Sequence, residues 1–140
     1  MARVSRRWES LHDHRTVRDF SDLRVWNNAM GLVEAVYTVT RTFPPGERFG
    51  LSQQMPRCAV SIPSNIAEGQ SRGGTRDFAR FLGMARGSAA ELRTQLSLSH
   101  RLGYVNETRA EELLSQTLHV SRQLTSQRNS LLKRLTSQPS

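Results

Sequence analysis

The sequence predicts an all-α protein, an antiparallel up-down four-helix bundle with a kinked second helix. Apolar residues recur at three- and four-residue steps in four segments, turn residues separate these segments, and strand-like alternation persists nowhere. Hydrophobic residues make up 36% and aromatics 6% of the chain, a lean composition that suits helices packed through narrow apolar stripes. At 140 residues the chain has the length of one domain, and short connections favour up-down packing.

The first helix is predicted to begin at Ser21 or Asp22, either of which can cap it, and to end before Pro44 and Pro45. The residue before a proline is pushed out of the α region, and proline has no N–H to donate. The apolar positions that share one face of this helix are Leu23, Trp26, Met30, Val33, Val36, Tyr37 and Phe43.

The second helix is expected to begin with Ser52 as N-cap, after the turn residue Gly50, and to end at Gly69 as its C′ residue. Two prolines, Pro56 and Pro63, lie inside this span. Pro63 removes a backbone hydrogen bond and should kink the helix. The segment is therefore either one kinked helix or two short helices.

The third helix is predicted to run from a Thr75 cap to Leu102 and to be closed by Gly103. Asn106 can cap the last helix, which runs to Leu135. We expect residues 1–20 to form a mobile basic arm, residues 21–135 the bundle and residues 136–140 a polar tail.

The formal net charge is +8, and Lys133 is the only lysine, so nearly all positive charge is guanidinium. Arginine suits bidentate contact with phosphate or carboxylate, and the net charge favours a polyanionic partner. Genomic base composition is the alternative explanation for the arginine bias.

Cys58 is the only cysteine, which excludes an intrachain disulfide and a cysteine-based zinc site. The first 20 residues lack the apolar core of a signal peptide, and no apolar stretch approaches the roughly 20 residues that span a bilayer. We therefore expect a cytoplasmic protein with no membrane partner.

Small residues gather in the third helix, where Gly83 and Gly87 precede Ser88, Ala89 and Ala90. Each glycine costs about 1 kcal/mol relative to alanine inside a helix, so something should compensate. Close packing within the bundle is the simplest explanation; a neighbouring subunit or a ligand pocket are the alternatives.

A polar face is predicted on the second helix, where Ser61, Asn65 and Glu68 follow one another at spacings of four and three. A carboxylate near a helix C-terminus opposes the helix dipole, so Glu68 should have a positive partner. Candidate partners are Arg72, Arg76 and Arg86. We expect these residues, together with Glu91, to clamp the second helix to the third; a catalytic role is the alternative.

No enzyme pattern is present, since the four histidines lack metal-ligand spacing and no glycine-rich phosphate loop follows a strand. We predict neither catalysis nor a cofactor nor a metal site. The arginines expected to contact nucleic acid are Arg72, Arg76, Arg80, Arg122, Arg128 and Arg134.

The chain resembles the bacterial 23S rRNA intervening-sequence proteins, which are four-helix bundles, from about Phe20 to Leu135. The matching elements are Phe43, Pro44, Glu47, Phe49, Gly50, Leu51, Gln54 and Arg57, the run SIPSNIAEG from Ser61 to Gly69, the run FARFLGMARGSAAEL from Phe78 to Leu92, and Thr94, Gln95 and Leu96. The structural motif expected from this match comprises Gly50, Gln54, Arg57, Ser61, Pro63, Asn65, Glu68, Gly69, Gly87, Ser88 and Glu91. Pro56 and Arg93 depart from the family pattern, which typically has a basic residue and a glutamate there.

That family is similar to the accessory variability determinant proteins of diversity-generating retroelements, pentameric bundles that bind nucleic acid and a reverse transcriptase. The resemblance implies a homopentamer with basic surfaces for RNA or DNA and a reverse transcriptase as candidate partner. It supplies no reaction. We therefore expect a non-enzymatic, self-associating bundle that binds nucleic acid, with a protein-protein adaptor as the alternative.

Overall fold

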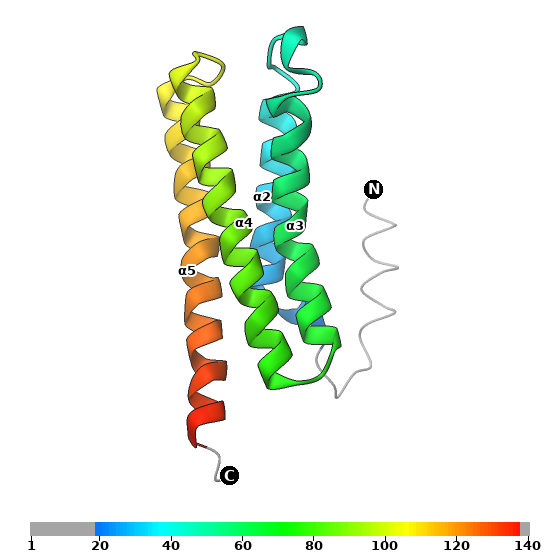
Figure 1. Ribbon diagram of the computed structural model, residues 1–140. Coiled ribbons are helices and arrows are strands. Elements are labelled where there is room, and N and C mark those ends of the chain that lie inside the picture. Colours follow the sequence, from blue (N-terminus) through cyan, green and yellow to red (C-terminus); the bar gives the residue numbers. More distant parts are fainter. Residues whose placement is uncertain (1–18, 138–140) are drawn as a thin grey trace.

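Four long helices run alternately up and down in the computed structural model, which describes residues 19–137 (Figure 1). They are α2 (Arg24–Thr40), α3 (Leu51–Ser71), α4 (Thr75–Arg101) and α5 (Glu107–Ser137), accompanied by the 3-10 turns η1 (Phe20–Asp22) and η2 (Pro45–Glu47). Each helix packs against the next along the chain, and α5 also packs against α2, which closes the bundle. The predicted all-α up-down architecture is confirmed.

The core is one continuous cluster of aliphatic side chains between the four helices. Burying each large aliphatic side chain contributes about 1.5–3 kcal/mol relative to leaving it in water. Alanines are fully buried on three of the helices, which allows their backbones to approach closely. The largest completely buried aliphatic side chains are Leu32, Val36, Met55, Ile62, Ile66, Leu82, Leu92, Leu96, Leu113, Val120 and Leu124, and the completely buried alanines are Ala29, Ala59, Ala85 and Ala89.

Helix α2 begins later than predicted, at Arg24, because the chain first forms the turn η1. The carboxylate of Asp22 accepts a hydrogen bond from the Asp19 N–H at 3.0 Å, so it serves this turn and not α2. The Phe20 ring packs on Trp26 with centroids 5.3 Å apart, which holds η1 against the helix. Phe43, predicted to lie on the helix, is buried just beyond its end.

Helix α3 is continuous across Pro56 and Pro63, so the alternative of two short helices is wrong. The bend expected at Pro63 stays a prediction. The predicted cap is also wrong: Gly50 is the N-cap, and the Glu47 carboxylate accepts a hydrogen bond from the Leu51 N–H at 3.0 Å. The Glu47 side chain, from the preceding turn, thus caps the N-terminus of α3 in place of Ser52, the residue predicted from the sequence.

The sequence predicts Gly69 as the end of α3, but this residue is buried inside the helix, which continues to Ser71. A Cβ atom at Gly69 would lie 2.6 Å from the Phe81 Cβ and 3.2 Å from the Phe78 Cδ1. The missing side chain therefore permits α3 to approach α4. The left-handed backbone conformation of the turn is adopted by Gly73, with φ of 78°.

The ends of α4 and α5 agree in part with the prediction. Thr75 is the first residue of α4 and Gly74 its N-cap, without a side-chain bond, whereas Gly103 closes α4 with φ of 79° as expected. The Asn106 cap is confirmed, because its Oδ1 accepts from the Arg109 N–H at 2.8 Å. Helix α5 extends through Ser137. The predicted arm, up to residue 18, and tail residues 138–140 lie outside the described residues.

Among the helices of residues 19–137, none combines the length and the apolar character that a membrane crossing requires.

Changing Gly69→Ala should destabilise the protein by about 1–3 kcal/mol, because the new methyl group would collide with Phe81. Gly87→Ala is the matched control: for this exposed helical glycine, no heavy atom of the described residues outside its own helix backbone lies within 4 Å of the Cβ position. Alanine there should stabilise the helix by up to about 1 kcal/mol. Urea unfolding followed by circular dichroism measures both, and equal stability of the two variants would contradict the close approach.

Candidate functional site

Two of the predicted arginines share one aromatic ring at the end of the bundle where α3 turns into α4. The guanidinium carbons of Arg72 and Arg80 lie 4.9 and 4.7 Å from the centroid of Phe81, which is 8% exposed. The two cations come from different helices, and each contact is worth about 0.5–1 kcal/mol at an exposed site. The buried ring therefore fixes two guanidinium groups at this corner.

The two arginines that contact Phe81 form only weak ion pairs with acidic residues. Arg72 and Glu68 form an ion pair at 3.1 Å, and Arg80 and Asp77 form one at 3.7 Å, with all four side chains about half exposed. Exposed pairs of this kind contribute only about 0–1 kcal/mol, so a phosphate can replace the carboxylate at little cost. Arg76 is exposed and has no ion pair within residues 19–137.

Gly83 gives an α5 arginine room to lie against α4. A Cβ atom at Gly83 would lie 3.3 Å from the Nε of Arg128, and that Nε is buried without a hydrogen-bond partner in the described part of the chain. The space is thus filled by a side chain and not by another backbone. Gly87, in contrast, has no neighbour within 4 Å of its Cβ position among the described residues, so close packing between the four helices does not explain it.

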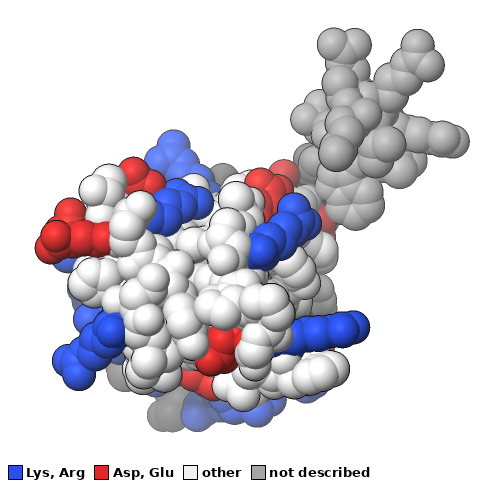
Figure 2. Space-filling model, turned by 90° about the horizontal axis from the view of Figure 1, so that it is seen from above, with Lys and Arg blue, Asp and Glu red and all other residues white. Residues whose placement is uncertain are grey.

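The remaining predicted arginines do not join this cluster. Arg134 lines a pocket at the same end of the bundle, whereas Arg122 is exposed on α5, about 18 Å further along the helix. Seen from the opposite end, basic side chains project around the whole rim with acidic ones between them (Figure 2). Positive charge is therefore not confined to one side of the molecule, and local geometry must distinguish a site.

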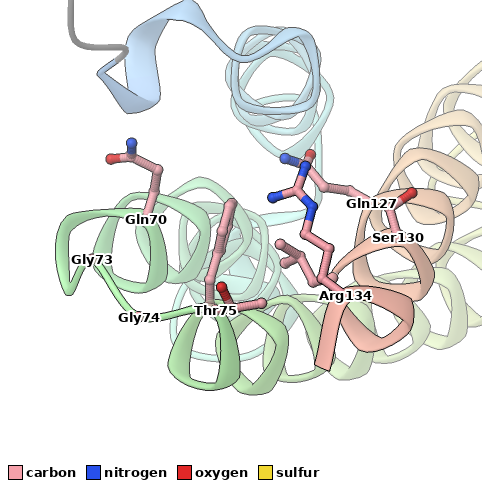
Figure 3. Close-up of a pocket in the computed structure, with 9 residues that line it drawn as sticks. Gln70, Gly73, Gly74, Thr75, Gln127, Ser130 and Arg134 are labelled. Atoms are coloured by element: carbon pink, nitrogen blue, oxygen red, sulfur yellow. The ribbon is translucent and has the colours of Figure 1, made fainter. Parts of the chain in front are cut away.

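The pocket beside Arg134 has a volume of about 280 Å³ and lies between the α3–α4 turn and α5 (Figure 3). Gln70 stands on one side, and Arg134 and Gln127 stand on the other, with the backbone of Gly73 and Gly74 along the turn. Its remaining lining residues are Thr75, Phe78, Ser130 and Leu131. The sequence does not reveal this pocket, because its lining comes from three helices and a turn.

A second, polar cleft of about 450 Å³ lies between α3 and α4. The Ser61 hydroxyl donates to the Cys58 carbonyl at 2.6 Å and lies 2.7 Å from the Ser88 hydroxyl, and the Cys58 thiol donates to the Ser88 carbonyl at 3.1 Å. Gln54, Arg57 and Glu91 complete the lining. Residues of the expected structural motif that are distant in sequence thus converge here.

The predicted clamp is corrected in its members. The Asn65 amide donates to the Ser61 carbonyl within α3, so Asn65 is not bonded to α4, contrary to the prediction. Glu68 has the predicted positive partner, Arg72, which lies just beyond α3 in the loop before α4. The Asn65 amide is therefore directed along α3, whereas the Glu68 carboxylate reaches the loop that precedes α4. Ser61 and Ser88 provide the link between α3 and α4 instead.

The cleft holds its thiol in the protonated form. The pKa of Cys58 is raised from 9.0 to about 12, first by burial and then by the nearby negative charge of Glu91. Within the described ranges, no three metal-ligating side chains gather at one place. A thiol that stays protonated is a poor nucleophile and a poor metal ligand.

A family model described as 23S rRNA-intervening sequence protein matches residues 21–126, which is more than half of the chain. The chain belongs to this family. The match spans α2, α3, α4 and most of α5, so the family resemblance predicted from the motifs is confirmed. The further similarity to retroelement accessory proteins stays a prediction.

A solved structure shares the fold of this chain. It is a protein of unknown function from the S23 ribosomal protein family of Bacteroides thetaiotaomicron, with a TM-score of 0.68 and 22% identity. The alignment covers 73% of this chain and 95% of that chain, so it supports the bundle architecture alone. No curated protein matches the sequence.

Alkylation of Cys58 by iodoacetamide should be slow at pH 8–9, because its pKa of about 12 leaves little thiolate. Glu91→Gln removes a negative charge beside the thiol, so the pKa should fall and alkylation at a given pH should accelerate. Glu68→Gln, an exposed carboxylate outside the cleft, should leave the rate unchanged. A midpoint of the rate–pH curve near 9 in the parent protein would contradict the assignment.

Proposed function

We propose that this protein is a non-enzymatic, self-associating bundle that binds RNA or DNA through arginines at the α3–α4 end. The observation that carries the proposal is the pair of guanidinium groups, Arg72 and Arg80, held over Phe81. Arg76 lies between them in sequence and is exposed. We define the arginine corner as these three arginines, Arg72, Arg76 and Arg80.

The chemistry of the arginine corner suits phosphate. Guanidinium groups bind phosphate in a bidentate manner, and their fixed position reduces the conformational entropy that binding would cost. The net charge of +8 draws a polyanion toward the molecule. The family description refers to 23S rRNA, which supports RNA as one candidate ligand.

Contacts of this type predict little sequence preference. Phosphate contacts set affinity and orientation, whereas base edges carry the sequence information. The arginine corner offers cations to phosphates, and the proposed contacts do not require a helix to enter the major groove of DNA and read base edges. We therefore expect binding to depend strongly on salt and weakly on base composition.

Self-association as a homopentamer is the second part of the proposal. The molecule exposes apolar side chains on several helices, and burial between copies would remove them from water. These side chains are Met30 and Tyr37 on α2, Val60 on α3, and Met84 and Leu98 on α4. Five copies would multiply the charge of the arginine corner and raise avidity for a long polyanion. The retroelement resemblance adds a reverse transcriptase as a further expected partner. A cytoplasmic location is expected from the single cysteine and the lack of a signal-peptide core.

A groove between α4 and α5 favours the alternative function, a protein-protein adaptor without direct nucleic-acid contact. The groove has a volume of about 710 Å³, and Leu98 in its wall is 45% exposed. Arg93 and Arg101 add positive charge to the wall, so an acidic amphipathic helix would fit it. The other lining residues are Ala90, Thr94, Ser97, Leu114 and Leu118. Apolar docking of this kind would persist at high salt, whereas binding through phosphates would not.

Reversing the charge of the arginine corner, with Arg72, Arg76 and Arg80 changed to Glu, should weaken nucleic-acid binding. The slope of log affinity against log salt should become shallower by about 0.7–0.9 for each phosphate that the variant no longer neutralises. Fluorescence anisotropy with labelled single-stranded RNA and duplex DNA, across a titration of salt, measures both quantities.

The matched control reverses Arg41, Arg48 and Arg101, three arginines at the other end of the bundle. Both variants undergo the same change in net charge. If binding depended only on general electrostatic attraction, both would therefore lose the same amount of nucleic-acid affinity. Equal losses would remove the arginine corner from the site. Absence of binding by the parent protein at low salt would instead favour the adaptor.

Light scattering coupled to gel filtration should return five times the chain mass of 15.9 kDa at micromolar concentration. The expected reason is burial of the exposed apolar side chains between copies. A mass near that of one chain would exclude a stable oligomer, and another multiple would exclude the pentamer while leaving self-association in place.

A further inference from the structure

Residues that line the pocket in Figure 3 are adjacent in sequence to residues of the arginine corner. Residues 73–75 line the pocket, and they are flanked directly by Arg72 on one side and Arg76 on the other. A strand whose phosphates follow the arginine corner would therefore meet the pocket at the same turn. The proposal that follows rests on the nucleic-acid binding proposed above.

We infer that this pocket holds one unpaired nucleotide of a single-stranded RNA or DNA bound at the arginine corner. Pockets that hold drug-sized ligands have volumes of about 300–1,000 Å³. This pocket, at about 280 Å³, lies just below that range, so it suits a smaller ligand such as a single base. A base inside a duplex is stacked and paired, and only an unpaired one can enter a concave site.

The side chains of the pocket match the parts of a nucleotide. The half-buried ring of Phe78 offers a face on which a base can stack, and every base has a π-face. The amide of Gln127 carries both donors and an acceptor, as base edges do. Arg134 has no ion pair within the described part of the molecule and provides a cation for the adjoining phosphate.

Two structural features keep the pocket open and its ring in place. Among residues 19–137, no neighbouring heavy atom lies within 4 Å of a Cβ built on Gly73 or Gly74, so no side chain of this part of the chain obstructs a strand that approaches the turn. Phe78 packs beside Gly69 of α3, since a Cβ there would lie 3.2 Å from its Cδ1. The helix packing that shapes the fold also positions the stacking surface.

The test compares single-stranded and duplex oligonucleotides of equal length on the full chain. Gln127→Ala and Arg134→Gln should each lower affinity for a single-stranded oligonucleotide and leave duplex affinity near the parent value. Loss of a stacked, oriented base corresponds to about fivefold or more in affinity. Lys133→Gln is the matched control for Arg134→Gln, because Lys133 is exposed, adjacent and outside the pocket lining.

A second readout reports stacking itself. An oligonucleotide with one 2-aminopurine should change its fluorescence on binding the parent protein, and Phe78→Leu should reduce this change. Circular dichroism checks that the Phe78→Leu variant remains folded. If that variant unfolds, the affinities of Gln127→Ala for single-stranded and duplex oligonucleotides still test the proposal.

Each outcome decides between the two proposals. Equal losses for single strands and duplexes in the pocket variants, or equal effects of Lys133→Gln and Arg134→Gln, would overturn the pocket and leave the arginine corner in place. Failure of the parent protein to bind either oligonucleotide at low salt would overturn both. Selective loss of single-strand binding with an intact duplex affinity supports the pocket.

Discussion

The close approach of α3 to α4 at Gly69 is the constraint on which most of the described structure depends. Because Gly69 has no side chain, the rings of Phe78 and Phe81 lie directly against the α3 backbone. Phe81 in turn carries the guanidinium groups of Arg72 and Arg80. The turn at Gly73 then has to reverse the chain over a short distance, which its positive φ allows. Fold and surface chemistry thus share one cause.

The regular parts of the fold can be predicted from sequence because they depend on local signals. Helical periodicity, the Pro44–Pro45 stop and the Asn106 cap act within a few residues of their effects. The prediction for Gly69 is wrong for the opposite reason: a glycine at a helix end and a glycine under a helix crossing look the same in one dimension. Only the position of Phe81, twelve residues later, distinguishes them.

The candidate site can be predicted only as a set of residue types. Charge identifies the arginines, but their common ring, Phe81, has the sequence pattern of a core residue, and Arg122 lies apart from the others. Ser61 does link α3 to α4 and Glu68 does pair with Arg72 as predicted, while the Asn65 amide bonds within α3. Side-chain direction at a helix terminus depends on the turn that follows, and the sequence does not specify that geometry.

The unequal lengths of the helices have a consequence of their own. Helix α2 has 17 residues and α5 has 31, which correspond to about 26 and 46 Å. A four-sided core can extend only as far as its shortest helix. The C-terminal end of α5, which carries Arg134, extends beyond the other helices and is supported on fewer sides (Figure 1). Adding or removing one turn of α5 would reshape this end without disturbing the core. Related chains can therefore vary the shape of this end while keeping the same folded centre.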